Sequence, residues 1–344
     1  MKPFKTALVG FGKIGAGYAA DPAMVRHYPH ATHAQILRDH PAFEWIGVAD
    51  PSGDARGSAQ TNWAIGNVAA AARDLVGADT VEVAVMATPP AQRLTVLDAF
   101  PNLRGVLAEK PLGETVEQGE EFIAECQRRG ISLAVNLFRR FDPQLVDLAA
   151  GGLRETIGEP QTAFMTYGNG LINNGVHLID LVHMLLGDTQ SAQSLFSETA
   201  FEAGPIFNDL NFPFALQLKG GLAVMASPLD FSSYREIGLD VWGGRGRMQL
   251  LNEGLTRMVT RTGPNRAMTG ESELLHETTQ SQSTRIGEAM YKGYDNLAEN
   301  LMAGQALQCD GETGLKAEKI IAALFASRKA NGQCLRTECK TANG

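Results

Sequence analysis

An apolar run in the sequence ends in three residues that could carry chemistry. In VLAEKPLG, residues 106 to 113, Glu109, Lys110 and Pro111 follow a stretch typical of a buried parallel strand. Ligands of parallel sheets lie at the carboxyl ends of the strands, and an ammonium group there stabilises a developing alkoxide or polarises a carbonyl. We therefore predict that Lys110 is catalytic. The alternative is that Glu109 and Lys110 are solvated loop charges, the more common fate of such a dipeptide taken alone.

The segment GFGKIG, residues 10 to 15, has the glycine spacing of a phosphate-binding turn. It follows an apolar strand and precedes a helical stretch, the context in which G-x-G-x-x-G binds a dinucleotide. The first glycine permits a tight turn, the second lets the backbone approach a pyrophosphate, and the third allows close packing of the helix, whose N-terminus faces the phosphates. The residues predicted to bind the cofactor here are Gly10, Gly12, Lys13, Ile14 and Gly15.

Asp50, at the end of the next apolar run, favours a dinucleotide with an unmodified ribose. A carboxylate there accepts hydrogen bonds from the adenosine ribose hydroxyls and repels a 2′-phosphate, which favours NAD over NADP. Ser52 and Arg56 follow closely and could tolerate a phosphate, so NADP stays open. The alternative for Asp50 is a cap on the next helix. Two later strand ends add further predicted cofactor contacts: Thr88, Pro89 and Glu109, the last through the nicotinamide carboxamide.

The interval between the glycine turn and Asp50 is longer than the usual spacing of about 20 residues. We assign the excess to AGYAADPAMVRHYPHATHA, an insertion that extends or breaks the first helix. Its histidines, His27, His30 and His33, suggest a metal, but Pro29 interrupts the helical register and no nearby carboxylate or cysteine completes a set. We predict no metal site, and favour a surface segment without a role over a lid or a substrate contact.

A histidine on a later apolar helix is a candidate general base. NNGVHLIDLVHMLLG, residues 173 to 187, contains His177, whose side chain titrates near neutrality when unperturbed. Asp180 lies one helical turn away, where it could orient the imidazole or bind a hydroxyl. We interpret His183, another turn along, as a hydrogen-bonded structural residue.

NLFRRFDP, residues 136 to 143, holds two arginines whose guanidinium forks suit a phosphate, a carboxylate or vicinal hydroxyls. We expect one of Arg139 and Arg140 to be structural, tied to Asp142 or to a helix end. The residues predicted to face the substrate are Asn136, Arg139, Tyr167 and Asp180.

These residues require elements that bring them to one edge of a sheet. The first part of the chain alternates continuous apolar runs with helical segments, which predicts an α/β fold with a parallel, doubly wound sheet. The predicted strands are residues 5–12, 43–50, 81–88, 105–111 and 131–138, and the clearest helices are residues 91–100 and 114–130.

After about residue 140 the apolar segments shorten and alternate with polar residues, as in an antiparallel sheet. The predicted strands are residues 161–168, 212–220, 222–231, 236–243 and 246–252. We predict a mobile polar loop at 276–285 and two helices around GETG between Tyr291 and Ala330. The predicted domains are residues 1–138, which bind the cofactor, and residues 139–344, which bind substrate and mediate oligomers.

Composition narrows the classes of function. The 344 residues are 44% hydrophobic and 20% charged with a net charge of −8, which disfavours an electrostatic contact with nucleic acid or anionic lipid. The four cysteines form no CxxC pair, so we interpret them as free thiols in a reducing compartment. No signal-peptide pattern and no apolar run of ~18 residues is present. We expect a cytoplasmic protein.

Strand–GxGxxG, VAD, MATPP, AEKP, NLFRRFDP and NNGVHLIDL occur in the order found in the Gfo/Idh/MocA oxidoreductases, and the closing helices are also similar. This resemblance covers nearly the whole chain. It implies an N-terminal Rossmann domain and a C-terminal α/β domain whose open, mainly antiparallel sheet often mediates oligomers, here a homodimer or homotetramer. It implies that Lys110 is the lysine of the EKP motif and that His177 lies at the substrate carbinol. Relatives carry an Asp where this chain has Asn173, which cannot take a proton and could instead bind a substrate hydroxyl.

The function favoured by these observations is an NAD-dependent oxidoreductase that transfers hydride between nicotinamide and a secondary alcohol or ketone of a carbohydrate. NNGVHLIDL most resembles members linked to surface-polysaccharide and sugar-nucleotide metabolism, so a sugar nucleotide is the first substrate hypothesis. A cyclitol such as inositol is the nearest alternative, and Asn173 counts modestly against it. A dinucleotide-binding sensor without turnover is a further alternative, against which the presence of both Lys110 and His177 argues.

Overall fold

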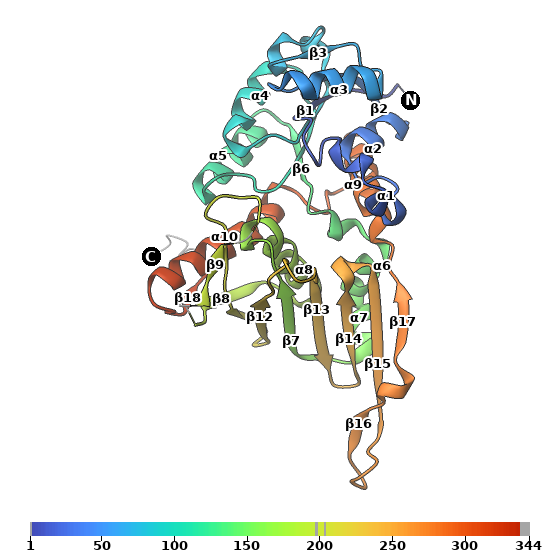
Figure 1. The fold of residues 1–344 in the computed structure, drawn as a ribbon, viewed down its shortest axis with the longest axis vertical. Helices are drawn as coiled ribbons and strands as arrows, with labels where there is room; N and C mark the ends of the chain where they lie inside the picture. Colours follow the sequence, from blue (N-terminus) through green and yellow to red (C-terminus); the bar gives the residue numbers. More distant parts are fainter. Residues whose placement is uncertain (1, 197–198, 203, 338–344) are drawn as a thin grey trace. The chain divides into compact units, whose positions relative to one another are not determined.

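The computed structural model describes residues 2–196, 199–202 and 204–337, and contacts divide the chain into two units (Figure 1). The first comprises Met1–Phe141 and Gly287–Leu315, and the second comprises Asp142–Ile286 and Lys316–Gly344. This differs from the predicted boundary after residue 138, because the chain returns to the first unit near its end. There α9 (Ile286–Ala303) places Met290, Tyr294 and Leu297 in the first unit's core.

The first unit is built on a six-stranded parallel sheet in the order β3-β2-β1-β4-β5-β6. The strand order reverses at β1, so the carboxyl ends of β1 and β4 flank the place where such sheets bind ligands. All residues of β4 and β5 are buried, which explains their continuous apolar sequences. The predicted doubly wound sheet is confirmed. Its strands are β1 (Phe4–Val9), β2 (Phe43–Ala49), β3 (Val68–Ala69), β4 (Val83–Met86), β5 (Gly105–Ala108) and β6 (Ser132–Val135).

The first helix of this unit is interrupted and then resumes. The backbone N–H groups of His33 and Ala34 donate to the carbonyl oxygens of Ile14 and Gly15, as the next turn of one helix would. Helix α2 (His33–Asp39) therefore continues the turn that begins at the glycine motif. The intervening residues loop out as a 3-10 turn, η1 (Gly17–Ala20), and a short helix, α1 (Pro22–His27). An insertion that breaks the first helix is thus confirmed, and it accounts for the long interval to Asp50.

Three further helices connect the strands: α3 (Gly53–Trp63), α4 (Arg93–Ala99) and α5 (Val116–Arg128). Helix α5 illustrates how its sequence sets its limits. The Thr115 side chain accepts a hydrogen bond from the backbone N–H of Gln118 at the start, and Gly130 adopts a φ of +68° after the end. Between them Phe122 and Cys126, one turn apart, are buried on the same face.

The second unit carries a ten-stranded sheet in the order β16-β15-β14-β13-β7-β12-β11-β8-β18, with β17 also paired to β15. The pairing of β7 with β12 is parallel and the other described pairings of this sheet are antiparallel, so the predicted mainly antiparallel sheet is confirmed. The strands are β7 (Pro160–Tyr167), β8 (Thr189–Ser194), β11 (Phe214–Leu218), β12 (Ala223–Pro228), β13 (Gly238–Gly243), β14 (Gly246–Leu251), β15 (Thr256–Pro264), β16 (Ser272–Leu274), β17 (Gln280–Ser283) and β18 (Leu335–Arg336). A separate pair joins β9 (Phe201–Glu202) to β10 (Leu210–Asn211).

Two predictions for the later part of the chain are wrong in detail. The stretch 276–285 is not a mobile loop, because it contains a 3-10 turn and the edge strand β17. All side chains of β17 are polar and exposed, so its sequence resembles that of a loop. GETG does not separate the last two helices. It opens the second of them, α10 (Gly311–Lys329), because the Asp310 side chain accepts a hydrogen bond from the backbone N–H of Thr313.

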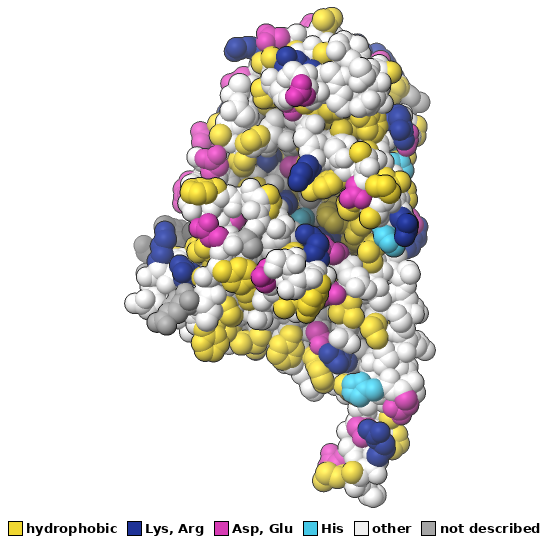
Figure 2. All heavy atoms as spheres, in the orientation of Figure 1, with side chains coloured by type: hydrophobic (Ala, Val, Ile, Leu, Met, Phe, Trp, Pro, Cys, Tyr) yellow, Lys and Arg dark blue, Asp and Glu magenta, His cyan; other side chains and the backbone are white. Residues whose placement is uncertain are grey.

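One face of the second sheet is buried and the other is accessible. Burial alternates along β7 and β12, and the buried side contacts α8 (Val176–Leu186), while α6 (Pro143–Asp147) and α7 (Leu153–Ile157) precede β7. Phe164 and Met225, directly paired across β7 and β12, are 45% and 39% exposed. In Figure 2 hydrophobic side chains gather over this part of the sheet. Within the described ranges, no helix combines the length and apolar character needed to cross a bilayer.

Candidate active site

The three glycines of the first turn have distinct surroundings. Gly10 has a φ of +94°, and a Cβ there would overlap the carbonyl oxygen of Ala87. A Cβ on Gly15 would lie 2.6 Å from the carbonyl oxygen of Gly10. A Cβ on Gly12 would meet nothing within 4 Å. The outer glycines therefore let the chain pack on itself, whereas the middle one leaves open space where a pyrophosphate would approach the backbone.

Asp50 ties the second strand to this turn. Its Oδ2 accepts a hydrogen bond of 2.7 Å from the backbone N–H of Phe11, and its Oδ1 accepts one of 2.8 Å from that of Ser52. Helix α3 is capped by Ser52, so the alternative of Asp50 as a helix cap is wrong. Arg56 donates to the carbonyl oxygens of Asp50 and Pro51. These contacts occupy the guanidinium group that was considered as a partner for the 2′-phosphate of NADP.

A cavity of about 800 Å³ lies at the carboxyl ends of β1, β2 and β4. Val9, Ala49, Thr88 and Pro89 line it, as the strand-end prediction requires. The hydroxyl of Thr88 is buried and has no hydrogen-bond partner among the described residues, so it is available to a bound group. The open space over Gly12 fits the pyrophosphate of NAD, the Asp50 carboxylate lies where the adenosine ribose is expected, and the Thr88 hydroxyl offers a further hydrogen bond in the cavity.

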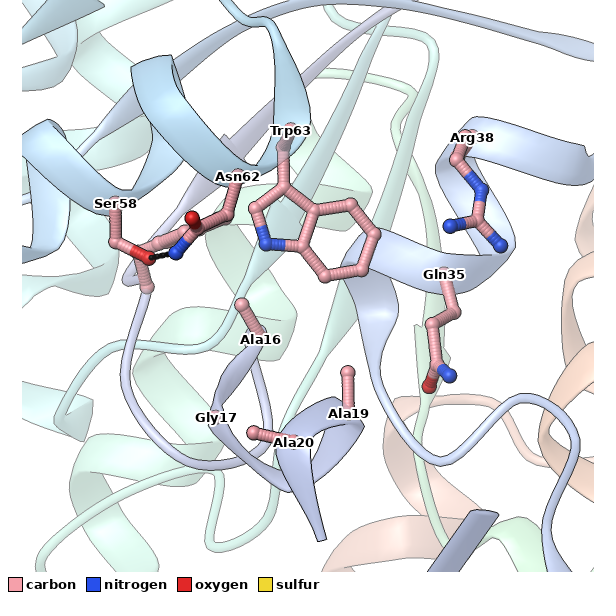
Figure 3. A pocket seen from close by; sticks show the side chains of 10 residues that line it. Ala16, Gly17, Ala19, Ala20, Gln35, Arg38, Ser58, Asn62 and Trp63 are labelled. Atoms are coloured by element: carbon pink, nitrogen blue, oxygen red, sulfur yellow. Dashed lines mark hydrogen bonds between the residues drawn. The ribbon is translucent and has the colours of Figure 1, made fainter. Parts of the chain in front are cut away.

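A separate hollow of about 380 Å³ lies on the helical side of the same unit (Figure 3). Trp63 of α3 and Arg38 of α2 face each other across it, with the guanidinium carbon 5.5 Å from the indole centroid. The small residues Ala19 and Ala20 of the inserted segment form part of its wall. It shares no lining residue with the cavity at the strand ends, so we do not assign it to the cofactor.

The backbone around Lys110 is held by a buried arginine. Arg93, 1% exposed, donates through Nη2 to the carbonyl oxygens of Glu109 and Pro111, the second at 2.7 Å. The backbone N–H of Glu109 donates to the carbonyl oxygen of Met86 on β4, at 2.9 Å. The peptide bond between Lys110 and Pro111 is cis. The lysine thus lies at the carboxyl end of β5, and the residues on either side of it are fixed to α4.

The side chain of Glu109 is also held. Its Oε1 lies 3.2 Å from Nε2 of His33 and accepts a 2.6 Å hydrogen bond from Nδ2 of Asn136. Nδ1 of His33 lies 2.8 Å from the hydroxyl of Tyr294. Burial opposes ionisation of Glu109, but the contacts with His33 and Asn136 and the charge of Lys110 outweigh it and hold the pKa of Glu109 below its usual range.

Two expectations change with this geometry. His33 is fully buried at the start of α2, so the interpretation of its segment as a surface feature without a role is wrong for this residue. Asn136 is 3% exposed, and its amide donates to the Glu109 carboxylate. It therefore supports the residue before Lys110 and is not exposed as an open substrate contact would be. No group of three or more His, Cys, Asp or Glu side chains that could hold a metal occurs in the described part of the chain.

In the second unit, an aspartate absent from the predicted set organises the approach to His177. Asp209, 1% exposed, accepts hydrogen bonds from the backbone N–H groups of Ile172 and Asn173, both at 2.8 Å, where a π-helical turn, η7 (Leu171–Gly175), leads into α8. Gly170, with a φ of +98°, is required there because a Cβ would overlap the Asp209 carboxylate. His177 then lies in the first turn of α8 and is 8% exposed.

The remaining predicted substrate residues differ in accessibility. Asn173 is half-buried, and its Nδ2 donates to the carbonyl oxygen of Asn169 at 3.1 Å. Asp180 is 1% exposed. Tyr167 is 1% exposed, and its hydroxyl donates to the carbonyl oxygen of Phe212 and accepts from its N–H, so it is a core residue and the substrate prediction is wrong.

Arg139 is buried, with its guanidinium carbon 4.8 Å from the ring centroid of Phe138. Asp142 caps α6 by accepting hydrogen bonds from the backbone N–H groups of Gln144 and Leu145. Of the two arginines considered, Arg139 therefore has the buried environment expected of the structural one. Its role as a substrate contact remains a prediction.

Both parts of the chain match described protein families. Residues 4–137 match the oxidoreductase family's NAD-binding Rossmann fold, and residues 164–334 match the oxidoreductase family's C-terminal alpha/beta domain. The rhizopine catabolism protein MocA of Rhizobium meliloti is 27% identical over 63% of this chain and 67% of its own length. Inositol 2-dehydrogenase of Rubrobacter xylanophilus is 26% identical over 52% of this chain, and the match spans about half of that protein, 55%.

Solved structures share the whole fold at low identity. The WlbA dehydrogenase from Bordetella pertussis, in complex with NADH and UDP-GlcNAcA, superposes with a TM-score of 0.72 at 18% identity. The superposition covers 98% of this chain and 100% of that one. At this identity the likeness establishes the fold alone.

Proposed function

Because this chain belongs to the Gfo/Idh/MocA family of oxidoreductases and carries its NAD-binding Rossmann domain, we propose that it is a dehydrogenase of a secondary alcohol on a carbohydrate, with sugar nucleotides as first candidates. The observation that carries the proposal is the position of Lys110. It follows the end of β5 by two residues, β5 is paired with β4, and the segment after β4 lines the cofactor cavity through Thr88 and Pro89. We further propose that the first unit binds the cofactor and the second unit supplies His177 and the substrate contacts Asn173 and Asp180, with Arg139 added from the first unit.

In this mechanism the chain handles a proton and a developing charge. Bound NAD supplies the acceptor for hydride in oxidation and the donor in reduction. The Lys110 ammonium group stabilises negative charge on the substrate oxygen. His177 takes the hydroxyl proton in oxidation and returns it in reduction. Asn173 offers hydrogen bonds but no site for a proton, so we assign proton transfer to His177 without an Asp–His relay.

The choice of substrate rests on the segment that leads into α8. Its sequence favours a sugar nucleotide, and the solved relative with UDP-GlcNAcA shares the fold. The match to an inositol 2-dehydrogenase supports a cyclitol as the alternative. In the structure Asn173 holds its own turn through Asn169, so it contributes to the shape of the site even where it does not contact substrate.

A substrate scan tests the proposal. Purified protein would be incubated with NAD and UDP-sugars or myo-inositol, and with NADH and keto-sugars, and the nicotinamide absorbance followed. A kcat/KM for a UDP-sugar at least about tenfold above that for inositol supports the sugar-nucleotide proposal, and the reverse order supports the cyclitol. NADH binding without turnover of any of these compounds would favour the sensor. Lys110→Met, which keeps an unbranched four-atom stem and removes the ammonium group, is the control for catalysis.

We also propose a homo-oligomer, a dimer or tetramer, that forms through the accessible face of the second unit's sheet. Phe164 and Met225 lie exposed on it, and the half-buried Trp242 stacks under Arg247 at 4.4 Å. Phe164→Arg should shift the sedimentation coefficient to that of a smaller species, and an unchanged value would exclude this face as the interface.

The three described cysteines are free thiols, which supports a cytoplasmic location as a proposal.

A further inference from the structure

We propose that His33 is a positioning residue of the active site: it fixes the carboxylate of Glu109, and thereby the surroundings of the Lys110 ammonium group. The proposal rests on the catalytic role of Lys110 in the proposed function. His33 belongs to none of the predicted sets of cofactor, substrate or catalytic residues. It lies where the first helix resumes after the insertion.

Both ring nitrogens of His33 are engaged. Nδ1 lies 2.8 Å from the hydroxyl of Tyr294, and Nε2 lies 3.2 Å from Oε1 of Glu109. The ring has no exposed surface, and its centroid lies 6.0 Å from that of Tyr294. A ring flip would break both contacts at once. The imidazole is therefore a rigid bridge between α9 and the residue that precedes Lys110.

The other contacts of Glu109 show what His33 adds. Arg93 and Met86 hold its backbone, and Asn136 donates to the same carboxylate oxygen that His33 contacts. The backbone would keep its place without His33, but the carboxylate would keep only one of its two described hydrogen-bond contacts, that with Asn136, beside the attraction of the Lys110 charge. His33 therefore determines the direction in which the Glu109 charge points, and not the path of the chain.

The direction of that charge matters because Lys110 is the adjacent cation. Glu109 is anionic in a site where its side chain is 12% exposed, and low solvent access strengthens its attraction to a nearby ammonium group. We expect that a carboxylate released by His33 turns toward Lys110. A carboxylate drawn onto the ammonium group competes with the substrate oxygen for it, which weakens stabilisation of the developing charge.

His40, at the end of the same helix, is a matched control. Its Nε2 lies 3.1 Å from Oδ1 of Asp295 on α9, its ring centroid lies 4.6 Å from that of Tyr291, and it is 5% exposed. Both histidines are buried, and both join α2 to α9 through a polar contact and a ring contact. They differ in their acidic partner: His33 contacts Glu109, the residue before Lys110, whereas His40 contacts Asp295. A purely structural role predicts equal consequences for the two positions, whereas a positioning role predicts a loss of turnover at His33 alone.

The first experiment compares His33→Leu with His40→Leu in the purified full chain, at equal NADH saturation and with the best substrate of the scan. We expect kcat to fall about 10- to 100-fold in His33→Leu and to stay within about twofold in His40→Leu, with similar losses of thermal stability in both. The NADH dissociation constant should change by less than about threefold in either protein. Equal falls in kcat, or a fall confined to KM or to NADH affinity, would overturn the proposal.

Tyr294→Phe provides a milder variant in case His33→Leu does not fold. It keeps the ring that packs on His33 and removes the hydroxyl that orients Nδ1. We expect kcat to fall about threefold or more, while the unfolding midpoint falls less than in His33→Leu, because one buried hydrogen bond is lost and the packing of both rings is kept. An unchanged kcat would show that the orientation of the imidazole has no effect on turnover.

A second readout needs no substrate and separates this proposal from the proposed function. The rate of acetylation of Lys110 by acetic anhydride is measured by peptide mass spectrometry, relative to the exposed Lys13. The rate should fall at least about threefold in His33→Leu, because the carboxylate then pairs more closely with the amine than it does in the wild type, and should not change in His40→Leu. This holds even if the substrate scan finds no turnover. An unchanged or faster reaction at Lys110 in His33→Leu would overturn the positioning role.

Discussion

Exchange of two neighbouring glycines for alanine should separate folding from cofactor binding. Gly10 has a φ of +94° and its Cβ would overlap the carbonyl oxygen of Ala87, whereas the Cβ of Gly12 would meet nothing within 4 Å. A left-handed backbone costs an L-residue about 1–2 kcal/mol, and overpacking a buried site adds about 1–3 kcal/mol. Gly10→Ala should therefore lower the free energy of unfolding by about 2–5 kcal/mol.

Gly12→Ala should behave in the opposite way. It meets no protein atom, and its φ lies outside the left-handed region, so stability should stay equal or rise by up to about 1 kcal/mol through the unfolded chain. The added methyl group occupies the space through which a pyrophosphate approaches the backbone. We expect NADH to bind at least about tenfold more weakly, a loss of ~1.4 kcal/mol or more.

Urea denaturation and NADH titration by fluorescence, run on both variants and the wild type, measure the two quantities. The denaturation slope should be unchanged, so that the midpoint reports stability. Gly12→Ala that binds NADH within about twofold of the wild type would refute the placement of the pyrophosphate over this turn. If the Gly10→Ala protein were as stable as the wild type, the conclusion that the turn at position 10 requires glycine would be refuted.

Further predictions concern single groups. Lys110→Ala should lower turnover by at least ~10²-fold with nearly unchanged NADH affinity, and unchanged turnover would remove the lysine from the mechanism. Asp50→Ala should weaken NAD binding more than NADP binding, and equal effects would contradict its ribose role. Folding lowers the pKa of Glu109, so the stability that its carboxylate contributes is present above the unfolded pKa and is lost as pH falls through the folded pKa. Glu109→Gln should therefore lose less stability on acidification than the wild type. The same dependence of the urea midpoint on pH in both proteins, between pH 6 and pH 3, would contradict this. Burial raises the pKa of the Cys126 thiol to about 12, so peptide mapping should find iodoacetamide at the exposed Cys334 long before Cys126, and equal rates would contradict its burial.

Patterns confined to one element were predicted well. The strands of the first unit are continuous apolar runs because both faces of their sheet are covered, and that property is visible in any short window. The glycine turn and Asp50 follow from the same strands. Tyr167 shows a local signal that was not used: it shares the buried face of β7 with Ala163 and Met165, four and two residues earlier. Strand alternation alone would have placed it in the core.

The buried polar contacts could not be predicted in this way. His33 meets Glu109 and Tyr294, which lie 76 and 261 residues away in the chain. Arg93 is the first residue of α4, and its partners are backbone carbonyl groups, which every residue has. Asp209 caps a turn that begins almost forty residues earlier. No short sequence pattern identifies these partners, because each buried hydrogen bond joins groups that only the folded chain brings within contact distance.

The amino-acid sequence by itself determined most strands of the parallel sheet, the dinucleotide turn and the identity of the lysine after β5, because side-chain periodicity and glycine requirements act over a few residues. Only the tertiary structure decided which polar groups surround that lysine. Desolvation makes an unpaired buried carboxylate costly, so the fold must supply partners for Glu109. It takes them from His33 of α2 and from Asn136 after β6, and Tyr294 of the distant helix α9 in turn contacts His33.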